Sequence, residues 1–148
     1  MKSSEIRDEL LSQHESLRGH LEAARLAVRR WAAGEVPVQH VRNELAALAD
    51  ALRTHNMREE AALRDLIRTI DAWGPERVEI MNEAHVREHH DIFEALYAVS
   101  QTQDAREGVA ELDRLRTRLL EHMAREEETF LNAYVLRDDD VAIDAQEG

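Results

Sequence analysis

The 148-residue chain is long enough for one domain with a buried core and too short to favour two. It contains no cysteine, which excludes disulfides, thiolate ligands and iron–sulfur clusters, so a bound metal would be held by nitrogen and oxygen atoms. The formal net charge of −12 and the run Asp138-Asp139-Asp140 repel phosphate groups, so we expect no nucleic-acid partner.

Apolar runs are short throughout the chain. The N-terminus has no apolar segment of signal-peptide length, and no other stretch approaches the thickness of a membrane. We therefore expect a soluble, cytoplasmic protein that does not bind membranes. The sequence indicates no particular protein partner.

Four long helices are predicted, because glycine and proline are sparse and gather at three places: Gly34 to Pro37, Gly74-Pro75 and Gly108. The first helix is expected from about Ser4 to Ala33 and the second from Pro37 or Val38 to about Ala72. The third should begin at Pro75, where a missing N–H has no cost. The fourth should begin at Asp104, which forms a capping-box pattern with Glu107. We expect one domain over residues 1–137 and an acidic tail over 138–148.

Apolar residues recur in alternating steps of three and four along each predicted helix. This spacing is typical of the buried seam of a helix in a bundle. The seams are Leu10, His14, Leu17, Leu21, Ala24, Val28 and Trp31; Val41, Leu45, Leu48, Leu52, His55, Glu59, Ala62 and Leu66; His85, His89, Ile92, Leu96 and Val99; and Leu112, Leu115, Leu119, His122, Glu126 and Thr129. Four such helices with short connections predict an all-α, up-down-up-down antiparallel four-helix bundle.

Histidines and glutamates replace apolar residues at one level of these seams. His55 and Glu59, and His122 and Glu126, are each four residues apart, and so are His85 and His89; His14 stands alone in the first helix. A spacing of four places two side chains on one helix face. Counted from the predicted turns at about 1.5 Å per residue, all four helices present these groups within about 6 Å of one level. Imidazole and carboxylate groups together suit a transition metal.

Seven ionisable groups buried together would be costly without a compensating ligand. A pair of metal ions removes that cost. The alternative is a structural polar layer in which the two carboxylates pair with protonated His55 and His122. The remaining histidines and the neighbouring glutamates step off the seams, so we expect them on solvated faces, with His90 also a candidate for a contact behind the ligands; they are His20, His40, His90, Glu60, Glu127 and Glu128.

Together these motifs resemble the hemerythrin-like, or HHE cation-binding, domains over nearly the whole chain. His14 to Leu17 resembles the family's motif in its first helix, and His55 to Glu59 the motif in the second. His85 to His89 and His122 to Glu127, followed by Phe130-Leu131, resemble the motifs of the third and fourth. The resemblance implies a four-helix bundle with a non-heme di-iron centre, and hence two iron ions as cofactors.

The resemblance also implies how the ligands are divided. One iron would take His85, His89 and His122 and the other His14 and His55, with Glu59 and Glu126 bridging both. Oxygen-carrying hemerythrins have an aspartate five residues after the last histidine, where this chain has Glu127. Helix periodicity favours Glu126 as the bridge, since it lies about 40° around the helix from His122 whereas Glu127 lies about 140° around.

The sequence therefore predicts a di-iron protein that binds dioxygen or a related small ligand, such as nitric oxide or peroxide, as a carrier, sensor or detoxifying module. The alternative is a peroxidase- or ferroxidase-like enzyme similar to the ferritin-like bundles. Those sites use Glu-x-x-His motifs, whereas this chain has histidine before glutamate and is rich in histidine. A third hypothesis is a helical interaction protein without metal. The sequence itself does not assign an enzymatic reaction.

Overall fold

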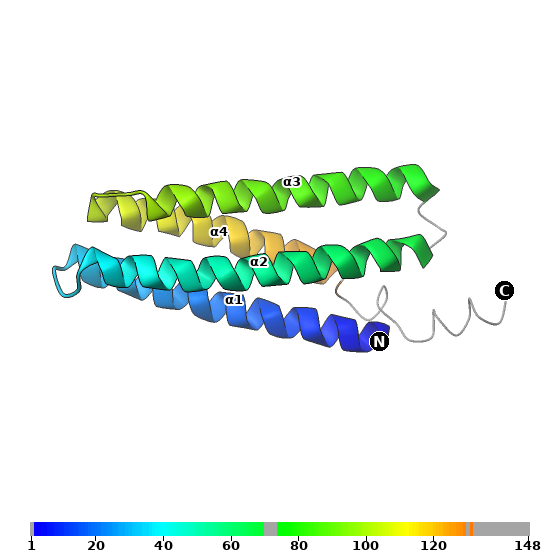
Figure 1. The fold of residues 1–148 in the computed structure, drawn as a ribbon, viewed down its shortest axis with the longest axis horizontal. Helices are drawn as coiled ribbons and strands as arrows, with labels where there is room; N and C mark the ends of the chain where they lie inside the picture. Colours follow the sequence, from blue (N-terminus) through cyan, green and yellow to red (C-terminus); the bar gives the residue numbers. More distant parts are fainter. Residues whose placement is uncertain (1, 70–73, 130, 132–148) are drawn as a thin grey trace.

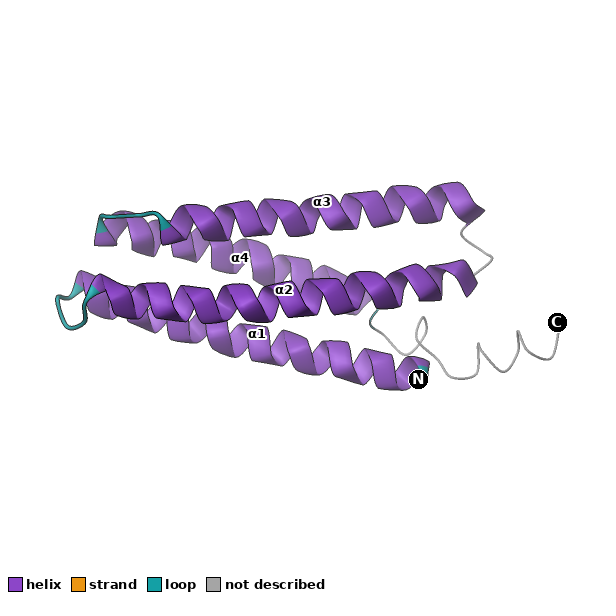
Figure 2. Cartoon of the chain, in the orientation of Figure 1, coloured by secondary structure: helices purple, strands orange, loops and turns teal. Residues whose placement is uncertain are grey.

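The computed structural model describes residues 2–69, 74–129 and 131, with side chains described outside 3, 63, 65–69 and 74–82. It contains four helices, and no strand occurs among these residues (Figures 1 and 2): α1 (Ser3–Ala32), α2 (Val38–Thr69), α3 (Gly74–Ser100) and α4 (Ala105–Thr129). Successive helices run in opposite directions, and each packs along its neighbours in the order α1, α2, α3, α4 and back to α1. The predicted antiparallel four-helix bundle is confirmed.

The helix ends follow from local chemistry. Gly34 adopts a positive φ of 75° after α1. Its N–H donates to the Trp31 carbonyl and the next N–H, that of Glu35, donates to the Arg30 carbonyl, at 3.0 and 2.8 Å. This pair of bonds is a Schellman motif, which favours glycine at the left-handed position. At the start of α4, Asp104 accepts the N–H of Arg106 on its side chain at 3.1 Å, as a capping residue does.

Two predicted boundaries differ from the structure. Helix α3 begins at Gly74, one residue before Pro75, so the proline lies within the first turn, where its missing N–H is tolerated. Gly108 does not interrupt a helix; it lies buried in the first turns of α4. A Cβ atom there would meet the Trp31 ring at 3.2 Å, so the glycine permits close packing of α1 against α4. The predicted end of α2 near Ala72 and the tail over 138–148 lie outside the described residues.

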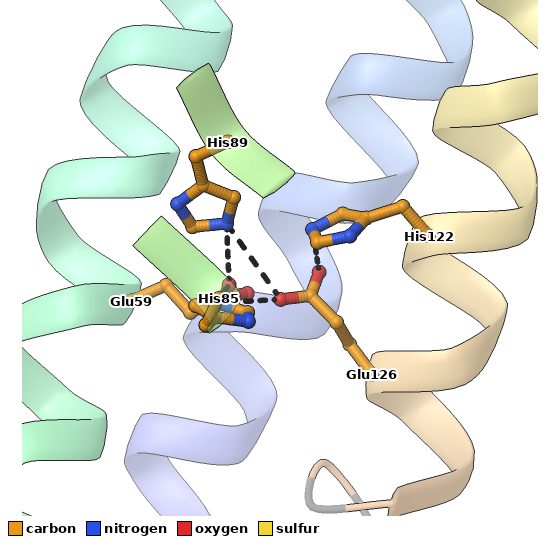
Figure 3. A group of neighbouring side chains, drawn as sticks. All are labelled: Glu59, His85, His89, His122 and Glu126. Carbon is orange, nitrogen blue, oxygen red and sulfur yellow. Dashed lines mark hydrogen bonds and ion pairs between the residues drawn. The ribbon is translucent and has the colours of Figure 1, made fainter. Parts of the chain in front are cut away.

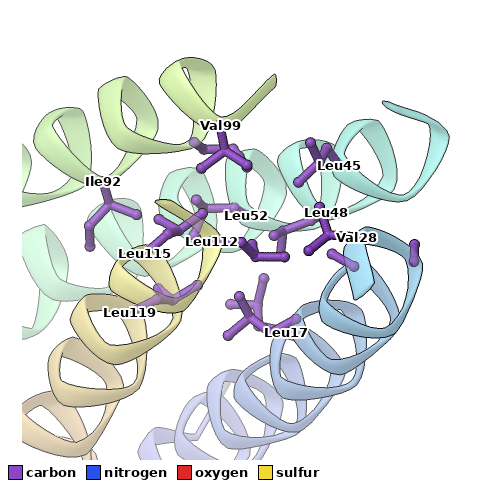
Figure 4. Packing of buried hydrophobic residues seen from close by; sticks show 14 of the residues in the cluster. Leu17, Val28, Leu45, Leu48, Leu52, Ile92, Val99, Leu112, Leu115 and Leu119 are labelled. Carbon is purple, nitrogen blue, oxygen red and sulfur yellow. The ribbon is translucent and has the colours of Figure 1, made fainter. Parts of the chain in front are cut away.

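The apolar seams form one core, shown in Figure 4. It fills the part of the bundle nearer the α1–α2 and α3–α4 connections, and its large members are Leu17, Leu21, Val28, Val41, Leu45, Leu48, Leu52, Ile92, Leu96, Val99, Leu112, Leu115, Leu119 and Met123. Each fully buried Leu, Ile or Val contributes about 1.5–3 kcal/mol. This core fixes the register of all four helices and therefore sets the level at which the next turn of each helix meets the others.

Candidate metal centre

The seven predicted site residues meet in one layer of the bundle, adjoining the apolar core. Every helix contributes: His14 from α1, His55 and Glu59 from α2, His85 and His89 from α3, and His122 and Glu126 from α4. Six are buried, with Glu59 and His14 fully inaccessible, and the side chain of His85 is 11% exposed. The structure thus brings all seven residues together, and their role as metal ligands stays a prediction.

Their donor atoms form two overlapping groups. In each group, one donor atom per residue lies within 4.8 Å of the others. The first group contains Glu59, His85, His89, His122 and Glu126 (Figure 3), and the second contains His14, His55, Glu59 and Glu126. Both glutamates belong to both groups. The arrangement therefore offers two neighbouring metal positions with two carboxylates between them.

The two oxygens of Glu59 face different groups of histidines. Its Oε1 atom lies 2.5 Å from Nε2 of His85 and 3.2 Å from Nε2 of His89. Its Oε2 atom lies 2.9 Å from Nε2 of His55 and 3.7 Å from Nε2 of His14. One carboxylate thus presents one oxygen to each metal position.

Glu126 lies between the same groups from the opposite side of the bundle. Its Oε2 atom is 3.1 Å from Nε2 of His85, and its Oε1 atom is 3.2 Å from Nε2 of both His14 and His122. Figure 3 shows the α3 and α4 imidazoles converging on the Glu59 and Glu126 carboxylates. Both bridging candidates from the sequence therefore occupy the shared position.

Most donor atoms of the layer lack the hydrogen bonds that buried polar groups require. Among the described residues, eleven buried side-chain nitrogen and oxygen atoms have no hydrogen-bond partner, and eight of them belong to this layer: both ring nitrogens of His14, Nε2 of His55, His89 and His122, Oε2 of Glu59 and both oxygens of Glu126. Nε2 of His85 and Oε1 of Glu59 do form a hydrogen bond, whereas these eight atoms lie close to one another without donor–acceptor alignment. Since such groups are otherwise costly to bury, the layer fits metal ions held by nitrogen and oxygen.

The other unpartnered atoms include both amide atoms of Asn56, a buried residue beside His55. Asn56 lies off the predicted apolar seam of α2, so helix periodicity does not mark it.

Without metal, the glutamates of the layer raise the pKa values of three of its histidines, His14, His85 and His122. Burial opposes charge on His14 and His85, but Glu126 and Glu59 outweigh it and raise the pKa of His14 to about 9 and of His85 to about 10. The pKa of His122 is raised in the same way against its burial, chiefly by Glu126. Burial likewise opposes ionisation of Glu59, yet the surrounding imidazoles of His14, His55 and His85 lower its pKa. A metal ion would displace the protons that the raised pKa values favour.

A comparison with protein families identifies the chain. The model of the Hemerythrin HHE cation binding domain matches residues 5–134, which include every donor described above. The chain belongs to this family. No curated protein and no solved structure matches it. Family membership makes cation binding the property of this domain, and the donor layer is compatible with it.

None of the described helices combines the length and the apolar composition that crossing a membrane requires.

Two of the residues that lie off the apolar seams, His90 and Glu127, have different surroundings in this HHE domain. His90 is exposed, and its Nε2 atom lies 3.7 Å from Oε1 of Glu94. It therefore does not contact the donor layer and is not the contact behind the ligands for which it was a candidate. Glu127 turns away from the shared position and accepts two hydrogen bonds from Arg18, at 2.7 and 3.0 Å. Its nearest approach to the layer is 3.8 Å, from Oε1 to Nδ1 of His14.

Helix periodicity predicted Glu60 on a solvated face, but the structure places it against a histidine of the layer. Its Oε1 atom lies 2.7 Å from Nδ1 of His89, and its side chain is 24% exposed. Two further residues contact the outer nitrogens of layer histidines: Gln13 Oε1 lies 2.7 Å from Nδ1 of His55, and Glu88 Oε1 lies 2.9 Å from Nδ1 of His122. We call Gln13, Glu60, Glu88 and Glu127 the outer acceptors.

The sequence placed Glu60 and Glu127 on solvated faces and did not single out Gln13 or Glu88, although the chain carries a signal for all four. Each one is the immediate neighbour of a donor: Gln13 precedes His14, Glu60 follows Glu59, Glu88 precedes His89 and Glu127 follows Glu126. In antiparallel helices, a step back on α1 and α3 and a step forward on α2 and α4 point to the same end of the bundle. A polar residue at these flanking positions was therefore recognisable from sequence and direction together.

Proposed function

We propose that this HHE domain binds two iron ions in the donor layer and uses them to bind dioxygen or a related small ligand, such as nitric oxide or peroxide, as a carrier, sensor or detoxifying module. The observation that carries this proposal is the set of eight buried donor atoms without hydrogen-bond partners. A cytoplasmic location stays a prediction from the sequence.

The donor set suits iron. Imidazole and carboxylate ligands without thiolate are typical of non-heme iron, and carboxylates shared by two positions are typical of di-iron bundles. His85, His89 and His122 would hold one ion and His14 and His55 the other, with Glu59 and Glu126 shared. When bound, iron supplies a redox couple and a coordination position for a small ligand.

The two positions differ in the number of donors. The first group offers five residues and the second only four. A position with fewer protein donors leaves room for an exogenous ligand, as open catalytic metal sites do. We therefore place small-ligand binding on the side of His14 and His55.

Apolar residues limit the access of water to the layer. Leu10 and Leu17 lie one turn to either side of His14, Leu52 lies one turn before His55, and Ile92 lies one turn after His89; all are at most 2% exposed. A dry wall of this kind strengthens electrostatic interactions and controls the reactivity of a metal ligand. The same wall admits small uncharged molecules more readily than ions.

Metal content is the first test. Protein purified without a histidine tag and loaded anaerobically with Fe²⁺ should contain about two irons per chain by elemental analysis. His89→Ala should lose iron, whereas His90→Ala should not, because His90 is exposed outside the layer. No metal, or a single zinc ion after maturation with iron available, would contradict the proposal.

Ligand chemistry is the second test. The reduced, iron-loaded protein is mixed in a stopped-flow spectrophotometer with dioxygen and, separately, with peroxide. A stable optical change that reverses on removal of dioxygen supports binding, while repeated consumption of the oxidant supports the peroxidase- or ferroxidase-like alternative. No optical response to either reagent or to nitric oxide would exclude small-ligand binding.

A further inference from the structure

The outer acceptors form a ring that passes once around the bundle. Each lies on one helix, beside a donor of that helix, and approaches Nδ1 of a histidine on the next helix. Gln13 on α1 approaches His55 on α2, Glu60 on α2 approaches His89 on α3, Glu88 on α3 approaches His122 on α4, and Glu127 on α4 approaches His14 on α1. Every helix contributes one outer acceptor, but the four differ in charge: Gln13 is neutral, whereas the other three are glutamates.

The charge of the outer acceptors differs between the two predicted metal positions. The group with three histidines has carboxylates in hydrogen-bonding contact with two of them, Glu60 with His89 at 2.7 Å and Glu88 with His122 at 2.9 Å. Glu88 also pairs with Arg125, which partly offsets its charge. Within the described part of the chain, Glu60 forms no ion pair with a lysine or an arginine.

The group with two histidines has a weaker outer environment. His55 meets the neutral amide oxygen of Gln13 at 2.7 Å. His14 faces Glu127 at 3.8 Å, beyond hydrogen-bonding distance, and Arg18 neutralises that carboxylate through two hydrogen bonds. The outer nitrogen Nδ1 of neither histidine is therefore within hydrogen-bonding distance of an unneutralised carboxylate.

A carboxylate that accepts the second N–H of a metal-bound imidazole makes that imidazole a stronger donor, and loss of such a partner typically weakens metal binding about 10- to 100-fold. We propose that Glu60 and Glu88 are positioning residues that make the His85, His89 and His122 position the tighter of the two, and the one whose iron is more readily oxidised. This inference rests on the proposed function, since it requires two ions in the layer.

Ligand number alone would also favour the group of five, so the test must isolate the charge of the outer acceptors. Glutamine is nearly isosteric with glutamate and keeps an acceptor oxygen. Glu60→Gln and Glu88→Gln therefore retain the contact and remove the charge. Gln13→Glu makes the reciprocal change behind His55. Glu94→Gln serves as the control, because it removes one charge from α3 at an exposed residue outside the layer.

Metal-free full-length protein is titrated with Co²⁺, with uptake followed by its d–d absorption and by competition with a chelator. The unaltered chain should bind two equivalents in two resolved steps. Glu60→Gln should weaken the first step about tenfold or more, and Glu88→Gln should weaken it less because Arg125 offsets Glu88. Gln13→Glu should tighten the second step and leave the first unchanged, and Glu94→Gln should change neither.

A second readout separates charge from simple support of the fold. In iron-loaded protein poised with redox mediators, Mössbauer spectra report each iron separately. Glu60→Gln should raise the potential of the first iron to be oxidised, and Gln13→Glu should lower that of the other and bring the two potentials together. A merely structural role for these residues would not reverse sign between Glu60→Gln and Gln13→Glu.

Three outcomes would overturn the inference. Uptake of fewer than two equivalents of Co²⁺ by the unaltered chain would remove the proposed function as well. Two equivalents bound in a single unresolved step would leave the function and remove the inequality of the positions. Two resolved steps that respond equally to Glu60→Gln and Glu94→Gln would show that the outer acceptors do not set the difference.

Discussion

The same four seams build two unlike regions. In the apolar core, residues such as Leu48 and Leu119 fill the space between helices and need no partner outside the chain. One turn further along the bundle, His55 and His122 occupy equivalent seam positions, and their Nε2 atoms have no hydrogen-bond partner. The core is thus complete in the folded chain, whereas the donor layer keeps buried polar atoms without hydrogen-bond partners.

This difference assigns stability and function to separate regions. Burial of apolar surface stabilises the bundle at any metal concentration. The donor layer costs free energy because its groups are desolvated and incompletely paired, and metal binding would return that cost as stability of the loaded form. Variants in the two regions should therefore respond differently to metal.

The largest expected effect is in the core. Leu48→Ala should lower the free energy of unfolding by about 2–5 kcal/mol, since Leu48 is fully buried and its replacement leaves a cavity. The loss should be the same in metal-free and metal-loaded protein, measured by denaturant unfolding. Leu26→Ala is the control, because Leu26 is 60% exposed and should change stability little. A loss confined to the loaded form would show that the two regions are not separable.

Metal loading should produce the next largest effect. At free Fe²⁺ about tenfold above its dissociation constant, each occupied position should stabilise the fold by about 1.4 kcal/mol, or about 3 kcal/mol for the two positions together. Anaerobic thermal unfolding of loaded and metal-free protein would measure this as a rise in melting temperature. Equal melting temperatures would contradict a layer that is completed by metal.

The sequence predicted the two regions with unequal success. Apolar spacing was sufficient for the bundle because the three- and four-residue steps in residues such as Leu17 and Leu21 depend only on helix geometry. The same spacing placed the seven donors in one layer. Apolar spacing alone did not predict the contacts of Glu60 and Glu88: their position beside a donor residue can be recognised in the sequence, but each contact crosses to a neighbouring helix and depends on the relative rotation of the two helices.

The next prediction separates the two carboxylates at the end of α4. Glu126→Gln should lower iron affinity by more than the 10- to 100-fold typical of outer partners, since Glu126 lies between both groups. Glu127→Gln should keep both irons, because Arg18 already neutralises Glu127 and His14 is 3.8 Å away. Iron content and the optical spectrum of each variant would decide. The reverse result would move the bridge to Glu127, at the spacing of the oxygen carriers.

The stability of the metal-free protein should also depend on pH. The pKa of His14 is raised to about 9 and that of His85 to about 10, from an ordinary value of 6.5. A raised pKa contributes stability that is fully present below 6.5 and is lost as pH rises through the folded-state value. Glu59 and Glu126, whose pKa values are lowered, stay ionised in both states across this window. The melting temperature of metal-free protein should therefore fall as pH rises from about 6 to about 10.

The apparent affinity for iron should rise with pH, whereas the stability of the metal-free protein falls. Iron needs neutral imidazole donors, so protons compete with it at the lower end of the window and its apparent affinity rises with pH. The difference in melting temperature between loaded and metal-free protein should consequently widen as pH increases. His90→Ala should preserve both slopes, since His90 lies outside the layer. The melting temperature of the metal-free protein could instead stay constant or rise over this window. That result would show that protonated histidines do not stabilise the metal-free layer by pairing with its glutamates.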